Sequence, residues 1–472
     1  MALSTVDNLS NNAQKIKGMI LSEILLAGAI ISVALASSTL VIGSLQSMLI
    51  NAENAFEAGL KIRQEISLAH LLSIDDISNF VKTEGIFTTI FSSSYRNDFT
   101  RNILVDVSWL EGPFQKHRSY SSQIVDWQKA SGAADCNWLD DAKGNLRAIN
   151  FGTLNIDDFN PVTDVVALGD YVYVSTDGAT SSLPDLYVID VHDIKNPNII
   201  AHINTGPGIA SIAAADQYVF AANAGSYQMQ IIDVIDPYHP TLISQAKLPG
   251  AIISGSSGFG QSVHFFDHKM YIGLVKNAGP EFFIVDVSDS QHPITLGSYE
   301  IGSTVNDIDV QGKRVTVVTP GQNSIILLDA SNPQRISEIS RSSLSGWQTQ
   351  GAQSVKMIGD QIVVGRTLGG FYSPNPELLQ LNRNLLNSTS TASTSLKMNA
   401  SIENIFGFND YIYLTTSDPD RGFQILKDDF SYGMILSSAF SSRGVALTCN
   451  NQAMYVVTQN DQDFFHIFTL TK

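Results

Sequence analysis

The chain has 472 residues, of which 44% are hydrophobic and 15% are charged, and its net charge at neutral pH is −17. This length exceeds a comfortable single domain, so we expect two modules, each with its own core. Most of the negative charge lies downstream of residue 160, and a surface of that sign repels phosphate backbones, which disfavours direct nucleic-acid binding.

The first predicted element is a long apolar helix. From Ile24 to Ile50 the chain carries no charged residue, and at about 1.5 Å per residue this stretch can cross a hydrocarbon core of about 30 Å. Gly18 lies before the apolar run, whereas a secretory signal peptide places its small-residue cleavage site after it. Glu23 has no Lys or Arg within helical reach, so its partner is expected in another chain.

The segment KGMILSE, residues 17–23, resembles the N-terminus of type IV prepilins and their pseudopilin relatives. The similarity rests on a short basic leader, Gly18 before the cut, apolar Met19, and Glu23 at the fifth mature position. It implies that a prepilin peptidase removes a leader of residues 1–18 and leaves a free or methylated amine at Met19. It also implies that Glu23 pairs with the amine of a neighbouring subunit in a filament. An ordinary membrane anchor is the alternative interpretation.

After the apolar run the pattern stays helical to about Leu72, and the alternation in ILVDVSW, residues 103–109, predicts a strand with one apolar face. The segment SYSSQIVDW follows as a second short strand. A long helix packed on a small antiparallel sheet again resembles the pilin fold. We therefore predict an α+β pilin-like stem over residues 19–144, with its helix over about 19–72.

The rest of the chain is repetitive. LYVIDVHDIKNP, MQIIDVIDPYHP, FFIVDVSDSQHP and IILLDASNPQR align on Asp190, Asp233, Asp286 and Asp329. Before each lies an apolar strand, a turn and a second strand, and this motif recurs at VKMIGDQIVV, IFGFNDYIYL and LTCNNQAMYV. The seven units are roughly 42 to 51 residues apart, the range of a β-propeller blade, and the apolar-IVD-polar motif resembles the LVIVD-repeat propellers. An all-β seven-bladed propeller is predicted over residues 145–472, with the four aspartates as structural turn residues.

The last unit supplies only three strands, so a strand from upstream must close the ring. Residues 145–156, NLRAINFGTLNI, are predicted to complete the last blade. Cys136 lies just before this strand, and Cys449 lies at a predicted turn on the same side, so a disulfide is sensible in an oxidising compartment. Two separate reduced thiols are the alternative. Neither cysteine belongs to a CxxC or Cys/His cluster, so no structural zinc is expected.

No catalytic constellation, metal site or cofactor motif is predicted, and we do not expect an enzyme. His264 and His268 flank a predicted turn, a pattern more typical of surface residues than of a metal site. The loops opposite the Asp turns carry aromatic residues that are candidates for ligand binding, since aromatics on loops are enriched at recognition sites. They are Phe259, Trp347, Phe371 and Tyr372. Packing over the propeller channel is the alternative role for them.

The resemblance to type IV pilins, together with the predicted propeller, implies a minor or tip subunit of a pilus-like filament that displays the propeller for adhesion or ligand recognition. The expected partners are other pilin subunits through the N-terminal helix, prepilin peptidase, the inner membrane before assembly, and a surface ligand that the sequence does not identify. The expected location is the bacterial inner membrane, then an extracellular pilus or the cell surface. Alternatives are an envelope-tethered propeller enzyme and a pseudopilin of a type II secretion-like machine.

Overall fold

A computed structural model describes the chain from residue 4 onward, and within α1 it leaves the side chains of residues 4–24, 28, 40, 43 and 47 undescribed. The other residues outside the description are 70–76, 78, 98–99, 112, 126–135, 137, 143–144, 150–153, 155, 157–159, 179–182, 322–323, 345–350, 359–360, 370–374, 383–391, 409–410, 431–433, 460–462 and 471–472. The chain forms two compact units: Met1–Tyr95 with Arg101–Ile124, and Arg96–Thr100 with Val125–Lys472. Residues 125–144, predicted as part of the stem, therefore belong to the second unit.

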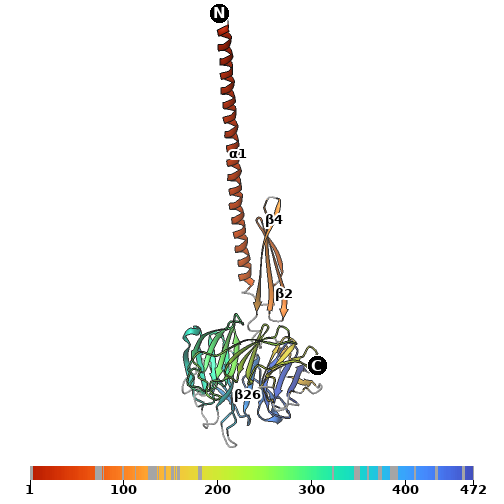
Figure 1. Ribbon diagram of the computed structural model, residues 1–472. Coiled ribbons are helices and arrows are strands. Elements are labelled where there is room, and N and C mark those ends of the chain that lie inside the picture. Colours follow the sequence, from red (N-terminus) through yellow and green to blue (C-terminus); the bar gives the residue numbers. More distant parts are fainter. Residues whose placement is uncertain are drawn as a thin grey trace. The chain divides into compact units, whose positions relative to one another are not determined.

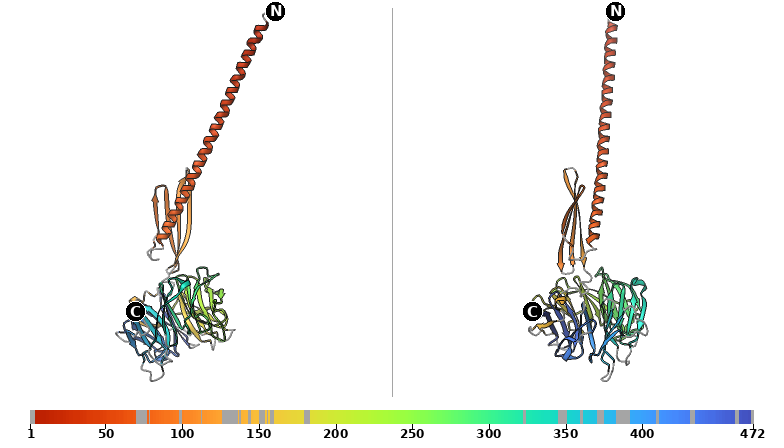
Figure 2. Two further views of the ribbon diagram at one scale, coloured as in Figure 1. Left: turned by 90° about the vertical axis from the view of Figure 1, so that its left-hand side faces the viewer. Right: turned by 180° about the vertical axis from the view of Figure 1, so that it is seen from behind.

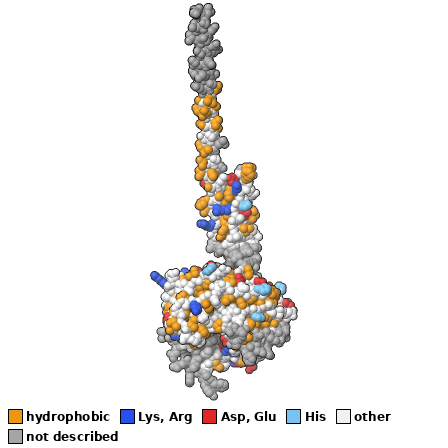
Figure 3. All heavy atoms as spheres, viewed as in Figure 1, with side chains coloured by type: hydrophobic (Ala, Val, Ile, Leu, Met, Phe, Trp, Pro, Cys, Tyr) orange, Lys and Arg blue, Asp and Glu red, His pale blue; other side chains and the backbone are white. Residues whose placement is uncertain are grey.

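The first unit begins with helix α1, Ser4–Ala69, which starts upstream of the predicted residue 19. By length and composition alone, its segment from Leu25 is long and apolar enough to cross a membrane. The described side chains of residues 25–50 are almost all exposed, and Figure 3 shows hydrophobic groups along this part of the helix. An exposed apolar surface of this extent requires a lipid or protein partner.

The lower part of α1 packs on a four-stranded sheet of order β1-β2-β3-β4, as both views in Figure 2 show. The strands are β1 (Phe80–Glu84), β2 (Phe87–Asn97), β3 (Thr100–Glu111) and β4 (Phe114–Val125). Alternation in β3 buries Ile103, Val105, Val107 and Trp109 against α1, which contributes Ala58, Ile62 and Ala69. The apolar face predicted for residues 103–109 is confirmed.

The second unit contains seven of the eight four-stranded sheets formed by the described residues (Figure 1). Their first strands are β6 (Val162–Leu168), β10 (Ile209–Ala215), β14 (Gly260–Phe266), β18 (Asp307–Gln311), β22 (Ala352–Ile358), β26 (Ile402–Phe408) and β30 (Gly444–Cys449). The second strands are β7 (Tyr171–Thr176), β11 (Tyr218–Asn223), β15 (Lys269–Leu274), β19 (Arg314–Val318), β23 (Gln361–Arg366), β27 (Tyr411–Thr416) and β31 (Met454–Thr458).

The third strands are β8 (Leu186–Asp190), β12 (Met229–Asp233), β16 (Phe282–Asp286), β20 (Ile325–Asp329), β24 (Leu378–Asn382), β28 (Phe423–Lys427) and β32 (Phe465–Leu470). The outer strands are β9 (Asn198–Ile203), β13 (Thr241–Ala246), β17 (Ile294–Tyr299), β21 (Ser337–Ser342), β25 (Thr394–Leu396), β29 (Met434–Ser438) and β5 (Leu146–Ile149). Short helices α2 (Leu139–Ala142), η3 (Pro333–Arg335) and η5 (Pro419–Arg421) complete the described elements.

The first strands of neighbouring sheets contact one another in a closed cycle, β6 to β10, β14, β18, β22, β26, β30 and back to β6. This cyclic arrangement of four-stranded antiparallel sheets is a β-propeller. Its sheets are sandwiched between neighbours, so the third strands are buried on both faces, as in the run Leu186–Ile189 of β8. This burial on both faces explains why third strands such as LYVID, residues 186–190, are apolar at consecutive positions and do not alternate.

The ring is closed by β5, which pairs antiparallel with β32, matching Ala148 with Phe468. The strand spans four residues of the predicted segment 145–156, and Ile156 packs in the adjacent core. Cys136 and Cys449 are joined by a disulfide that links positions 313 residues apart, with their Cα atoms at 5.8 Å. Both cysteines are buried in the cluster around β31 and β32.

Candidate functional site

The centre of the propeller holds a cavity of about 800 Å³, within the size range of small-molecule sites. Its lining comes from the beginnings of the seven first strands and from loops beside them. The turns that follow these strands, such as Gly169–Asp170, do not line it, so the cavity opens at the end of the propeller where the first strands begin.

Two layers of side chains from the first strands line the cavity, three residues apart along each strand. Residues at this spacing can share one surface because six of the seven first strands have a β-bulge at the mouth-layer residue. The mouth layer consists of Thr163, Ala210, Gln261, Asn306, Gln353, Glu403 and Val445. The inner layer consists of Val166, Ala213, His264, Asp309, Lys356, Phe406 and Thr448. Within each layer, one residue comes from each first strand in the order of the cycle, so each layer runs around the cavity.

Three inner-layer residues on consecutive strands, His264, Asp309 and Lys356, form a cluster of ionisable groups. Lys356 Nζ lies 2.7 Å from Asp309 Oδ1, while Asp309 Oδ2 accepts a hydrogen bond of 2.6 Å from the backbone N–H of Met357. His264 Nδ1 is 3.9 Å from Asp309 Oδ1. Burial lowers the pKa of His264 to about 4 despite the nearby carboxylate, so this imidazole is neutral at pH 7.

Glu403 of the mouth layer forms a second pair of opposite charges with Arg443, which precedes β30, and Arg443 Nη1 lies 3.9 Å from Glu403 Oε1. Burial raises the pKa of Glu403, and Arg443 partly offsets this shift. Asn306 Nδ2 donates to the carbonyl of Ala352 at 2.8 Å and to Gln353 Oε1 at 3.4 Å, which holds two amides of neighbouring strands together. The mouth is therefore lined by oriented amides and a carboxylate.

Asp164 and Asp307, also at the cavity, tie neighbouring sheets together. Asp164 Oδ2 accepts hydrogen bonds of 2.9 Å from the N–H of Ile212 and from the Ser211 hydroxyl. Asp307 Oδ2 accepts one of 2.8 Å from the N–H of Val355. Burial raises the pKa of Asp164 to about 6 and that of Asp307 to about 7, against the effect of these hydrogen bonds. We assign them a structural role because their oxygens are occupied by the next strand.

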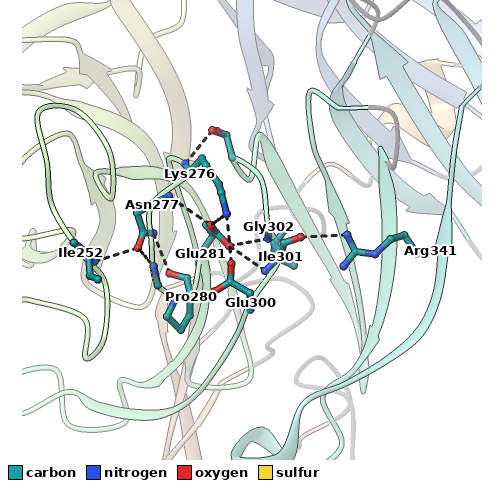
Figure 4. A network of polar contacts seen from close by, with 11 residues as sticks. Ile252, Lys276, Asn277, Pro280, Glu281, Glu300, Ile301, Gly302 and Arg341 are labelled. Atoms are coloured by element: carbon teal, nitrogen blue, oxygen red, sulfur yellow. Dashed lines mark hydrogen bonds and ion pairs between the residues drawn. The ribbon is translucent and has the colours of Figure 1, made fainter.

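A buried carboxylate also fixes the loops at this end of the propeller, as Figure 4 shows. Glu281 immediately precedes β16, and its Oε2 accepts hydrogen bonds from the N–H groups of Ile301 (3.0 Å) and Gly302 (2.9 Å). Its Oε1 accepts a hydrogen bond of 2.9 Å from Lys276 Nζ. Glu377, before β24, makes the same set with the N–H groups of residues 398 and 399 and with the ammonium of Lys397. These contacts hold the linkers that lead into the next first strands.

Of the aromatic residues predicted for ligand binding, Phe259 lines the cavity. Trp347, Phe371 and Tyr372 lie outside the described residues. Gly18, Met19 and Glu23 fall within α1, in the part whose side chains are not described. The structure therefore brings one predicted recognition residue to the site.

The four repeat aspartates lie at the other end of the propeller, each as the last residue of a third strand. Every one accepts a hydrogen bond of 2.9 Å through Oδ1 from the backbone N–H two residues ahead. The donors are His192 for Asp190, Ile235 for Asp233, Ser288 for Asp286 and Ser331 for Asp329. This geometry closes the turn that leads to the outer strand.

The sequence interpretation missed the inner-layer cluster, and it placed His264 beside a turn, as a surface residue. A signal was present, because His264, Asp309 and Lys356 occupy the second position of the motifs VHFF, IDVQ and VKMI. At the same position the other repeats carry Val166, Ala213, Phe406 and Thr448. The variable second position of an otherwise apolar inner strand marks the residue that faces the channel.

The described residues contain no group of three or more His, Cys, Asp or Glu side chains that could hold a metal ion. The cavity therefore offers hydrogen-bonding and apolar surfaces rather than a metal centre within the described part of the chain.

Comparisons with solved structures return chains of similar arrangement at low identity. A chain of the Mitotic Checkpoint Complex is 14% identical with a TM-score of 0.47, and the match covers 68% of this chain and 93% of that chain. Sqt1 from Saccharomyces cerevisiae is 10% identical with a TM-score of 0.45, over 66% and 84%. BamB from Moraxella catarrhalis is 13% identical with a TM-score of 0.42, over 69% and 89%. No protein-family model matches the chain. No curated protein matches it either.

Proposed function

We propose that this protein is a minor or tip subunit of a type IV pilus-like filament and that it displays its propeller for adhesion or ligand recognition. The observation that carries the proposal is the two-part character of α1. Residues 25–50 form an exposed apolar rod, whereas residues 58–69 of the same helix bury small and apolar side chains on a four-stranded sheet. A helix that serves only as a membrane anchor has no need of a folded sheet on its continuation.

Further support comes from apolar side chains that stay exposed on α1 beyond residue 50. Phe56 and Leu60 remain exposed on the part of α1 that packs on the sheet, with 67% and 48% of their surface accessible. The apolar surface of α1 therefore continues past residue 50, beyond the stretch needed to cross a bilayer. Lateral packing of α1 against other copies of the subunit accounts for both exposed segments.

For the second unit we propose a seven-bladed propeller that recognises a ligand without catalysing a reaction. Seven four-stranded sheets in a closed cycle of first strands support the blade count, with β5 completing the last one. A binding role is favoured over an enzymatic one because both cations that line the cavity are held by carboxylates, Lys356 by Asp309 and Arg443 by Glu403. We propose an extracellular location after passage through the inner membrane.

The filament role is tested by Glu23→Val. The substitution removes a charge at the edge of the apolar run, so membrane insertion should persist or improve. Entry into filaments should be lost, because the carboxylate partner of the neighbouring amine is gone. The measurement is the amount of the protein in filaments sheared from cells, relative to its amount in the membrane fraction.

Asp420→Val is the control, since it removes an exposed carboxylate from the second unit and should leave incorporation unchanged. Normal incorporation of Glu23→Val, or equal loss with both variants, would contradict the proposed assembly role.

A further inference from the structure

We infer that the central cavity binds a neutral, polyhydroxylated ring, the chemistry of a free sugar or of the terminal sugar of a glycan. This inference rests on the recognition role proposed above and is independent of the filament role. It follows from the size of the cavity, the distribution of polar groups around it, and the pairing of its charges.

The two layers of side chains are more polar on one side of the cavity than on the other. Strands β14, β18 and β22 contribute amides and charged groups, represented by Gln261 at the mouth and by Lys356 in the inner layer. Strands β30, β6 and β10 contribute small or apolar side chains to the layers, such as Val166 and Ala213. They also contribute the hydroxyl groups of Thr163 and Thr448. A ligand that fits both sides carries hydrogen-bonding groups on one edge and C–H groups on a face, which describes a sugar ring.

Both cationic side chains that line the cavity are paired with carboxylates. Lys356 and Asp309 are 2.7 Å apart, Arg443 and Glu403 are 3.9 Å apart, and His264 is neutral at pH 7 because burial lowers its pKa. An anionic ligand would be desolvated here without an unpaired cation to receive it, which is costly. A hydroxyl group both donates and accepts hydrogen bonds, so it can bridge such pairs without a net charge.

Two aromatic rings line the cavity, Phe259 before β14 at the mouth and Phe406 of β26 in the inner layer. The face of an aromatic ring carries partial negative charge and attracts the weakly positive C–H groups of a ligand. The Gln261 side chain has no hydrogen-bond partner among the described residues, so its donor and acceptor are available to a ligand. These groups define a site with both stacking and hydrogen-bonding partners.

The test uses the full-length protein in detergent, with binding measured by calorimetry and ligand-observed NMR. The probes are glucose, galactose, mannose and N-acetylglucosamine, the uronic acids of the first three, and the neutral sugars coupled to albumin. At least one neutral sugar, free or coupled, should bind. Where the panel includes the uronic acid of that sugar, the neutral sugar should bind more tightly than the acid. Binding of the free form indicates a soluble ligand, and binding of the coupled form alone indicates a surface glycan.

Two variants probe the site. Gln261→Ala should weaken binding about five- to tenfold through loss of a hydrogen-bonding group. Ala213→Phe should abolish it by filling the cavity, and the fold should tolerate this ring because Phe406 holds the same register position in its own sheet. Gln245→Ala, an exposed glutamine on the outer strand β13, is the matched control and should bind normally.

The inference is overturned if no neutral sugar binds, if a uronic acid binds more tightly than its parent sugar, or if Gln261→Ala binds as the parent protein does. Filament incorporation of Ala213→Phe is measured in parallel. Incorporation should be normal because the substitution lies in the propeller and not in α1. Failure of the sugar assay would therefore not count against the filament role, which this second measurement tests separately.

Discussion

At the scale of single residues, the Cys136–Cys449 bond makes a direct prediction. Reduction should lower the melting temperature, since loss of a native disulfide commonly costs about 2 to 5 kcal/mol of unfolding free energy. Both cysteines belong to the second unit, so only its transition should shift. The chain has no other cysteine, and the double variant Cys136→Ser/Cys449→Ser is therefore a clean control that should not respond to reductant. An unchanged melting curve of the parent protein under reduction would contradict the expectation.

A second residue-scale prediction concerns pH. Burial raises the pKa of Asp307 in the folded state to about 7 from an ordinary value of 3.8. The stabilising contribution of the neutral carboxyl is therefore fully present below about pH 4 and is lost as the pH rises through about 7. The melting temperature should fall between pH 5 and pH 8, by about 2 to 4 °C for each kcal/mol lost.

Asp307→Ser should flatten that fall, because the equivalent residue of the neighbouring sheet, Ser262, shows that serine is accommodated there. Exposed Asp420→Ser is the charge-matched control and should retain the slope of the parent protein. Identical slopes for Asp307→Ser and the parent would exclude Asp307 as the titrating group.

At the scale of elements, β5 decides whether the ring closes. A fragment starting at about residue 130 keeps β5 and Cys136 and should be monomeric. A fragment starting at about residue 160 leaves the edge of β32 unpaired, which promotes association with other chains. Size exclusion and thermal melting of both fragments measure the difference. Equal stability and equal monodispersity would show that the ring closes without residues 145–149.

The elements also show which parts of the fold can be predicted from sequence patterns. The repeats around Asp190, Asp233, Asp286 and Asp329 predict the second unit because each strand and turn has a local signal of its own. The cavity does not have such a signal, since its lining brings together single residues from seven segments distant in the chain. His264 thus looks like an isolated polar residue until the ring places it beside Asp309. The sequence places the boundary between stem and propeller after residue 144, whereas the second unit takes in the chain from Val125. The difference arises because α2 and Cys136 join the propeller through tertiary packing, which has no local signal.

At the scale of the whole molecule, two units with separate cores divide two tasks in the proposed function. The stem supplies an exposed apolar helix for assembly, and the propeller supplies a cavity whose lining does not depend on the stem. Substitutions in the cavity should therefore alter recognition and leave assembly intact, whereas substitutions in α1 should do the reverse. Measuring filament incorporation and ligand binding on the same set of variants checks this separation.

The proposed filament role is tested most directly by the N-terminus of the protein at the cell surface. Intact-mass analysis of material sheared from cells should find a chain that begins at Met19, with residues 1–18 removed and the new amine free or methylated. Surface protein that still carries residues 1–18 would contradict the filament role.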